Sequence, residues 1–162
     1  MKKNMVWWFL IVIVVVGILV FITINSKRVD YSNSKIAGEE QNNMQNAQQI
    51  EGVKIIILKD GNGDIAKSGD TVAMNYTGKL ADGTIFDSNV DPKFNHVQPF
   101  VFTIGAGQVI RGWDVGIAGM KVGEGRILEI NPDYAYGETG AGGVIPPNAT
   151  ISFEVELLQI EK

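Results

Sequence analysis

Residues 150–160 read TISFEVELLQI and alternate apolar with polar side chains almost without interruption. The apolar set and the polar set fall on opposite faces of an extended chain: Ile151, Phe153, Val155 and Leu157 on one, Ser152, Glu154 and Glu156 on the other. This two-residue period is typical of an antiparallel strand with one face on a core and one in water. The stretch therefore predicts a half-buried strand and, with it, an antiparallel sheet.

Four more short runs with strand-like composition precede it, at Val53–Leu58, Thr71–Leu80, Phe100–Ile104 and Arg126–Asn131. Glycine-rich turn sequences separate them. One of these, residues 60–64 (DGNGD), resembles the start of a calcium loop, but Ile65 and Thr71 occupy the positions that require Gly and Glu. We expect a hairpin turn there.

One segment departs from the strand pattern. Residues 108–118 place Val109, Ile110, Trp113 and Ile117 at the spacing of a helix with one buried face. The predicted fold class is therefore α+β, an antiparallel sheet with one short helix packed on it.

Composition divides the chain into three parts, predicted as residues 1–24, 25–50 and 51–162. The middle part is rich in Asn and Gln and is expected to be a polar linker, with a short helix at 39–49 as an alternative. The third part carries nine basic and 15 acidic residues, which argues against a nucleic-acid partner. The chain has no cysteine and one histidine, which excludes thiolate metal sites and makes a Ser–His–Asp triad unpromising.

The first part contains an apolar run from Met5 to Ile24, in which 18 of 20 residues are apolar and none is charged. A 20-residue helix spans about 30 Å, the thickness of a bilayer's hydrocarbon core. We expect an uncleaved membrane anchor, the alternative being a cleaved signal peptide. Basic residues are equal in number at the two ends, and the short leader favours a domain on the extracytoplasmic side.

The only histidine, His96, lies in a proline-flanked loop with no second metal ligand nearby in the sequence. We interpret it as an exposed structural histidine.

Three blocks of sequence are more specific than any of these patterns. They are NYTG (75–78) with DGTIFDS (82–88), QVIRGWD (108–114), and NPDYAYG (131–137) with VIPPNAT (144–150). In this order and spacing they resemble the FKBP-type peptidyl-prolyl cis–trans isomerases across nearly all of residues 52–160. The resemblance implies a curled antiparallel sheet around one short helix, with an aromatic pocket between them.

Carried over by position, the resemblance implies two sets of site residues. The catalytic set is Tyr76, Phe86, Asp87, Trp113, Tyr136 and Phe153, and the substrate-binding set is Phe100, Val109, Ile110 and Ile145. Trp113 would form the pocket floor, while the Tyr136 hydroxyl and the Ile110 N–H would bind substrate carbonyls. Asp87 would interact with the twisting amide or orient Tyr76, the alternative being a structural salt bridge with Arg111.

The resemblance also implies partners: proline-containing protein substrates and macrolide inhibitors of the FK506 and rapamycin type, with no metal or other cofactor and a monomeric enzyme. Two features depart from the family pattern. Ala141 stands where many members carry histidine, and residues 89–99 form a longer segment than in the smallest members. The alternative function is therefore a non-catalytic module that binds proteins through the same pocket.

Overall fold

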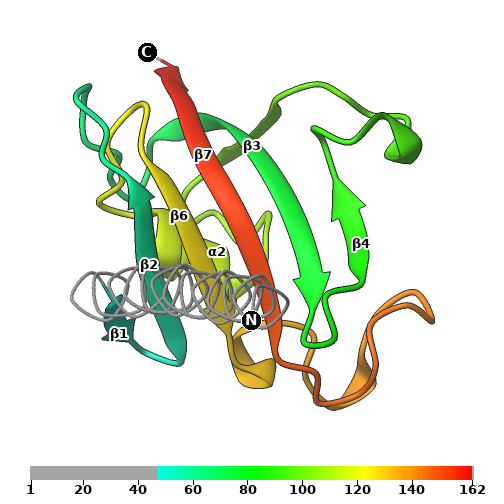
Figure 1. Ribbon diagram of the computed structural model, residues 1–162. Helices are drawn as coiled ribbons and strands as arrows, with labels where there is room; N and C mark the ends of the chain where they lie inside the picture. The colour runs from blue at the N-terminus through cyan, green and yellow to red at the C-terminus, as the bar shows by residue number, and fades with distance from the viewer. Residues whose placement is uncertain (1–46, 162) are drawn as a thin grey trace, which may run out of the picture. The chain divides into compact units, whose positions relative to one another are not determined.

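The computed structural model describes residues 47–161, which form one antiparallel sheet and one α-helix (Figure 1). The strands are β1 (Ala47–Ile50), β2 (Val53–Lys59), β3 (Thr71–Leu80), β4 (Ile85–Ser88), β5 (Phe100–Thr103), β6 (Gly125–Ile130) and β7 (Ile151–Glu161). Their order in the sheet is β1-β2-β6-β7-β3-β4, and β5 also pairs with β3. Three single-turn 3₁₀ segments lie in the loops: η1 (Pro92–Phe94), η2 (Pro132–Tyr134) and η3 (Gly137–Thr139).

Strand β7 lies in the middle of the sheet, between β6 and β3 (Figure 1). Its alternating residues behave as predicted, since Ile151, Phe153, Val155 and Leu157 are buried and Glu154 is exposed. They join a single hydrophobic core that also takes in β2, β3, β5, β6 and the helix. The predicted antiparallel sheet with one helix is confirmed for the described residues.

Helix α2 (Arg111–Ile117) packs on the core-facing side of the sheet, behind β6 and β7 in the view of Figure 1. Trp113 and Ile117 are buried as predicted. The helix is shorter than the predicted 108–118, because Ile110 has an extended backbone (φ −62°, ψ 148°) and acts as the N-cap. Val109 and Ile110 therefore lie before the helix rather than on its face.

Two glycines set how closely α2 approaches the sheet. A Cβ on Gly116 would lie 2.8 Å from Cδ1 of Leu128, and a Cβ on Gly112 would overlap the side chain of Ile130. Leu128 and Ile130 are themselves completely buried on β6. The helix backbone thus rests directly on the strand, which fixes the position of Trp113.

The predicted linker at 25–50 ends too late, because its last four residues form β1. This strand pairs with residues 53–56 of β2 through a two-residue turn at Glu51 and Gly52, both with positive φ. Positive φ at both central residues defines a type I′ hairpin. Strand β1 has no alternation of apolar and polar residues. Its pairing rests on backbone hydrogen bonds at the sheet edge. Residues 47–49 are thus strand, not helix, and the rest of the 39–49 alternative lies outside the described residues.

The hairpin predicted at residues 60–64 is wrong. Strand β2 pairs with β1 and β6, whereas β3 lies on the far side of β7. The segment instead runs along residues 120–122, with Gly63 N–H donating to the Val122 carbonyl at 3.1 Å and Val122 N–H to the Asp64 carbonyl at 2.9 Å. Turn-forming residues predict a change of direction but do not specify the partner strand.

The predicted membrane anchor (residues 1–24) and all but the end of the predicted linker lie outside the described residues. Within residues 47–161, no helix has the length and apolar character needed to cross a bilayer.

Candidate active site

The site is built around an interruption in the pairing of β3. The first half of β3, residues 71–74, pairs with β5, while residues 77–79 pair with β4. Between these two ladders, Asn75 and Tyr76 have no strand partner on this edge. The gap lets the chain between β4 and β5 approach the sheet at Tyr76.

Asn89 fills this gap and is only 3% exposed. Its side-chain Oδ1 accepts a hydrogen bond from Tyr76 N–H at 2.7 Å, and its Nδ2 donates to the carbonyls of Met74 (2.9 Å) and Gln98 (2.8 Å). An asparagine side chain here takes the place of a strand partner and ties residues 89–99 to the sheet. The sequence reasoning did not identify Asn89, because a buried polar residue in a loop leaves no periodic signal.

Tyr76 and Asp87 form the polar centre of the site. The Tyr76 hydroxyl donates to Asp87 Oδ2 at 2.8 Å, and the Ser88 N–H donates to Asp87 Oδ1 at 2.9 Å. Burial, the hydrogen bond to Asp87 and the negative charge of Asp87 raise the pKa of Tyr76 well above that of an ordinary tyrosine. Burial and the same carboxylate also raise the pKa of Tyr136. Both hydroxyls therefore remain protonated at neutral pH.

Trp113 is the centre of an aromatic cluster and is 4% exposed. Its ring centroid lies 5.2 Å from that of Phe153, 5.4 Å from Tyr76 and 6.0 Å from Phe100, all in edge-to-face orientation. Aromatic pairs in this orientation stabilise the fold by more than the burial of their apolar area alone, and they favour this one relative orientation of the rings. The cluster thus holds the indole ring in place from several strands at once.

Gly78, from the NYTG block, is required by this cluster. Phe86 packs edge-to-face on Phe153 with centroids 5.4 Å apart. A Cβ on Gly78 would lie 2.6 Å from the Phe86 ring and 2.7 Å from the Phe153 ring. The absence of a side chain at residue 78 is what lets both rings lie over β3.

A cavity of about 220 Å³ opens between α2 and the sheet. Eight of the ten expected site residues line it, together with Gln108, which was not expected: Tyr76, Asp87, Phe100, Val109, Ile110, Trp113, Tyr136 and Phe153. Phe86 and Ile145 do not line it. Phe86 packs behind Phe153, and Ile145 is buried in the loop after η3, where its N–H and carbonyl pair with those of Ala141.

Several hydrogen-bonding groups at the cavity have no partner among residues 47–161. They include the Tyr136 hydroxyl and the backbone N–H of Ile110, whose own carbonyl accepts from Trp113 N–H at 2.9 Å. The indole Nε1–H of Trp113 is also buried without a partner in the described part of the chain. The cavity therefore combines aromatic walls with a few unsatisfied donors, the composition expected of a site for a small polar–apolar ligand.

Comparison with known proteins agrees with this geometry. Residues 63–158, more than half of the chain, match the family model described as FKBP-type peptidyl-prolyl cis-trans isomerase. The chain belongs to this family. FK506-binding protein 1 of Dictyostelium discoideum is 55% identical over 107 residues, covering 66% of this chain and 96% of that protein. Peptidyl-prolyl cis-trans isomerase Fkbp12 of Drosophila melanogaster is 50% identical over 111 residues, covering 68% and 99%.

A peptidyl-prolyl cis-trans isomerase of Schizosaccharomyces pombe is 52% identical over 110 residues, which cover 67% of this chain and 95% of that enzyme. The part of the chain that the structure describes thus corresponds to nearly the whole length of these relatives. The chain is an FKBP-type peptidyl-prolyl cis–trans isomerase.

The loop from Asn89 to Pro99 gives the FKBP domain an additional feature beside the cavity. His96 is exposed, as predicted, yet its Nε2 lies 3.0 Å from Asp87 Oδ1. Arg111, considered above as a partner for Asp87, instead lies over the ring of Tyr134 at 4.5 Å. A second cavity of about 530 Å³ is lined by this loop and shares Tyr76 and Phe100 with the first.

Sequence reasoning missed the contact of His96 with Asp87 because it spans the gap in the sheet. The one available signal was the extra length of the loop.

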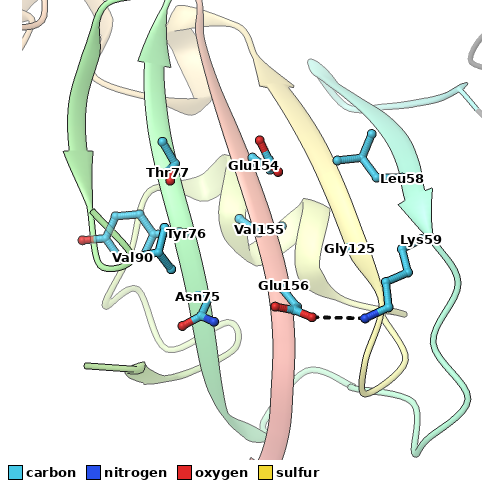
Figure 2. A pocket seen from close by; sticks show the side chains of 10 residues that line it. All are labelled: Leu58, Lys59, Asn75, Tyr76, Thr77, Val90, Gly125, Glu154, Val155 and Glu156. Atoms are coloured by element: carbon cyan, nitrogen blue, oxygen red, sulfur yellow. Dashed lines mark hydrogen bonds and ion pairs between the residues drawn. The ribbon is translucent and has the colours of Figure 1, made fainter. Parts of the chain in front are cut away.

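A further hollow of about 330 Å³ lies over the outer face of the sheet (Figure 2). Its walls include Glu156, whose carboxylate pairs with Lys59 at 3.3 Å, and Gly125, which leaves the space unfilled. Tyr76 is the one member of the aromatic cluster among its lining residues, and Figure 2 shows the Tyr76 ring directed away from β7. Although larger than the aromatic cavity, it is not lined by Trp113 and shares only Tyr76 with the expected site residues, and we do not assign it to the isomerase site.

Proposed function

We propose that this FKBP domain rotates X–Pro bonds by holding the proline ring in the 220 Å³ aromatic cavity, with Trp113 as its floor. The observation that carries the proposal is the convergence of Tyr76, Phe100 and Phe153 on the Trp113 ring, all within about 6 Å of its centroid. An apolar slot of this kind fits the ring of a proline and excludes water from the adjoining amide.

The chemistry requires no bond to be made or broken. Rotation about X–Pro is slow because the C–N bond has partial double-bond character, with a barrier of about 18–20 kcal/mol. The twisted amide has lost this conjugation and is less polar than the planar form. A dry cavity therefore binds the twisted amide better than the planar one, and about 1.4 kcal/mol of this difference gives a tenfold rate increase.

The unsatisfied donors would fix the direction in which the substrate peptide lies in the cavity. The Ile110 N–H and the Tyr136 hydroxyl lie at the cavity without partners in the described chain, and in this proposal they bind substrate carbonyls. The Asp87 carboxylate, held by Tyr76, lies beside the rotating amide. Residues that flank the proline would extend into the adjoining 530 Å³ cavity at residues 95–101.

A refolding assay limited by proline isomerisation tests the activity. Within residues 47–161 the buried core runs from Val53 to Leu157, and the relatives above consist almost entirely of this domain. A fragment beginning at Asn43 is therefore suitable. We expect the fragment to accelerate the slow phase, and Trp113→Leu, Phe86→Ala and Asp87→Ala each to lower kcat/KM by about tenfold or more, the effect of losing about 1.4 kcal/mol.

The control is Leu58→Ala on the outer hollow, which should retain full activity. Wild-type activity in all three variants, with the fold intact, would show that the cavity is misassigned. An inactive wild type that still binds proline peptides would instead support the non-catalytic binding module.

We also propose that macrolides of the FK506 and rapamycin type occupy this cavity. The support is the name of the Dictyostelium relative and the eight lining residues shared with the expected site. Isothermal titration calorimetry with FK506 should show one site per chain that is lost in Trp113→Leu. Sedimentation of the free fragment should show a monomer.

For location, we propose that residues 5–24 anchor the chain in a membrane with the FKBP domain on the extracytoplasmic side, where it acts on exported chains. The support is the uncharged 20-residue run, preceded by Lys2 and Lys3. Added protease should then digest the domain on intact cells or spheroplasts that produce the full chain. A domain that remains fully protected would contradict this orientation.

A further inference from the structure

His96 occupies an unusual place beside the polar centre of the site. Its Nδ1 lies 2.7 Å from the Phe94 carbonyl oxygen, two residues before it in the same loop. Its Nε2 lies 3.0 Å from Asp87 Oδ1 and 3.4 Å from the Tyr76 hydroxyl. One ring therefore bridges the loop and the two polar side chains on which the catalytic arrangement rests.

These contacts indicate which protonation state of the His96 ring fits the structure. A carbonyl oxygen can only accept, so the Nδ1 side of the ring must donate to Phe94. A carboxylate is also acceptor-only, so the Nε2 side must donate to Asp87. A neutral imidazole carries one N–H and would direct a lone pair at one of these oxygens. Only the imidazolium form of His96 satisfies both contacts.

The groups that face His96 come from three different elements. It faces the carboxylate of Asp87 on β4, the hydroxyl of Tyr76 on β3 and a backbone carbonyl of η1. The hydroxyls of Tyr76 and Tyr136 stay protonated, because burial and the Asp87 charge raise the pKa of each. The other charged pair of the loop, Lys93 with Asp91, is satisfied within the loop at 3.3 Å.

We propose that His96 is a positioning residue of the isomerase site. As an imidazolium, it holds the Asp87 carboxylate so that Oδ2 accepts from the Tyr76 hydroxyl, and loss of its proton releases Asp87. Three donors converge on this carboxylate, namely Ser88 N–H, Tyr76 OH and His96 Nε2–H, and of these only the His96 ring can carry a positive charge. The proposal rests on the function proposed above.

The first test is the pH dependence of kcat/KM for the full chain, produced without a histidine tag. We expect wild-type activity to be highest near pH 5.5 and to fall by about three- to tenfold as histidines lose their charge. His96→Gln should show the lower activity at all pH values. His96→Arg, which keeps a cation at every pH, should show the higher activity throughout.

The matched control is Lys93→Gln, which removes a positive charge from the same loop without touching Asp87. Its pH profile should equal that of the wild type. A His96→Gln enzyme with an unchanged wild-type profile would overturn the positioning role.

The second test does not depend on activity. His96 is the only histidine in the chain, so its Cε1–H signal in an NMR titration is unambiguous. We expect the ring signals of Tyr76 to shift over the same pH interval as the His96 signal, and this shift to vanish in His96→Gln. A Tyr76 ring that stays unmoved while His96 titrates would contradict the link. A wild type without isomerase activity that still shows the linked shifts would refute the proposed function alone.

Discussion

At the scale of single residues, the site depends on groups that are polar yet shielded from water. Tyr76 shows this most clearly, since its hydroxyl donates to a carboxylate at the edge of an aromatic cluster. The folded chain holds the tyrosine proton more tightly than the unfolded chain does, because burial and the Asp87 charge both oppose the phenolate. The stability from this group is therefore complete below about pH 10 and is lost as the pH rises further.

An alkaline absorbance titration tests this electrostatic coupling. The difference between the wild type and Tyr76→Phe isolates one hydroxyl, which should titrate above the ordinary tyrosine range. Asp87→Asn should lower the pKa of Tyr76 but leave it above the ordinary value, because burial remains. A Tyr76 hydroxyl that titrates like a free tyrosine in the wild type would show that it is neither buried nor coupled to Asp87.

Gly78 leads to a prediction about the shape of the cavity. A methyl group at residue 78 would overlap the rings of Phe86 and Phe153, and overpacking of this kind costs about 1–3 kcal/mol. Gly78→Ala should therefore lower the melting temperature and reduce kcat/KM, since Phe153 must shift into the cavity. Thermal unfolding and the refolding assay measure the two effects. Full activity in a stable Gly78→Ala protein would show that the ring positions are not critical.

At the scale of elements, the position of α2 depends on its contact with β6. Gly112→Ala should destabilise the fold, although alanine favours a helix by about 1 kcal/mol over glycine. The reason is that the new methyl group would overlap Ile130, which is completely buried. The expected loss is about 1–3 kcal/mol in the free energy of unfolding, measured in urea.

Gly125→Ala is a matched control for this prediction. Its Cβ would lie 3.7 Å from Lys59 Cβ, which is an ordinary contact, and its φ is not in the left-handed region. We expect this variant to be within about 0.5 kcal/mol of the wild type or slightly more stable. Equal losses in both variants would mean that the contact of residue 112 with Ile130 is not the cause.

The arginine of a buried ion pair joins the same two elements. Arg126 on β6 donates through Nε to Glu124 and through a guanidinium N–H to the Gly116 carbonyl at 2.8 Å, and both charged side chains are almost fully buried. Arg126→Met leaves the Glu124 carboxylate buried and unpaired, and we expect a loss of about 3–5 kcal/mol. The double variant with Glu124→Gln should recover much of this loss in the same urea experiment. If the double variant is no more stable than Arg126→Met, the pair is not what the arginine stabilises.

The strands and the helix could largely be predicted from the sequence, because each has a periodic pattern of its own. The alternation in β7 and the spacing of Trp113 and Ile117 are local features that the tertiary structure retains. What failed was pairing. Residues 60–64 have the composition of a turn, but only the sheet order decides which strand lies next to β2. Strand β1 is held by backbone hydrogen bonds, and its side chains have no pattern that predicts this pairing.

The site divides in a similar way. The aromatic positions came from the family resemblance, and the structure brings most of them to one cavity. Asn89 and His96 could not be predicted, because each acts across the gap between β4 and β5, and a loop's path over the sheet has no signature in sequence. Phe86 was expected at the cavity from the resemblance, but it packs against Phe153 and does not line the cavity.

At the scale of the whole molecule, the FKBP domain carries its own core. Among the described residues, the buried cluster extends from Val53 to Leu157. A fragment beginning at Asn43 should therefore unfold in one cooperative transition, at the melting temperature of the domain in the full chain. Calorimetry of both forms checks this. A fragment that melts several degrees lower would show that residues 1–42 contribute to the fold.

The central claim is that one aromatic cavity both holds the proline and accelerates its rotation. NMR exchange spectroscopy with the fragment and a short X–Pro peptide measures both properties in one sample. We predict cis–trans exchange peaks that require the protein, together with nuclear Overhauser contacts from the proline ring to the Trp113 indole. Exchange without contacts to Trp113, or contacts without accelerated exchange, would contradict the claim.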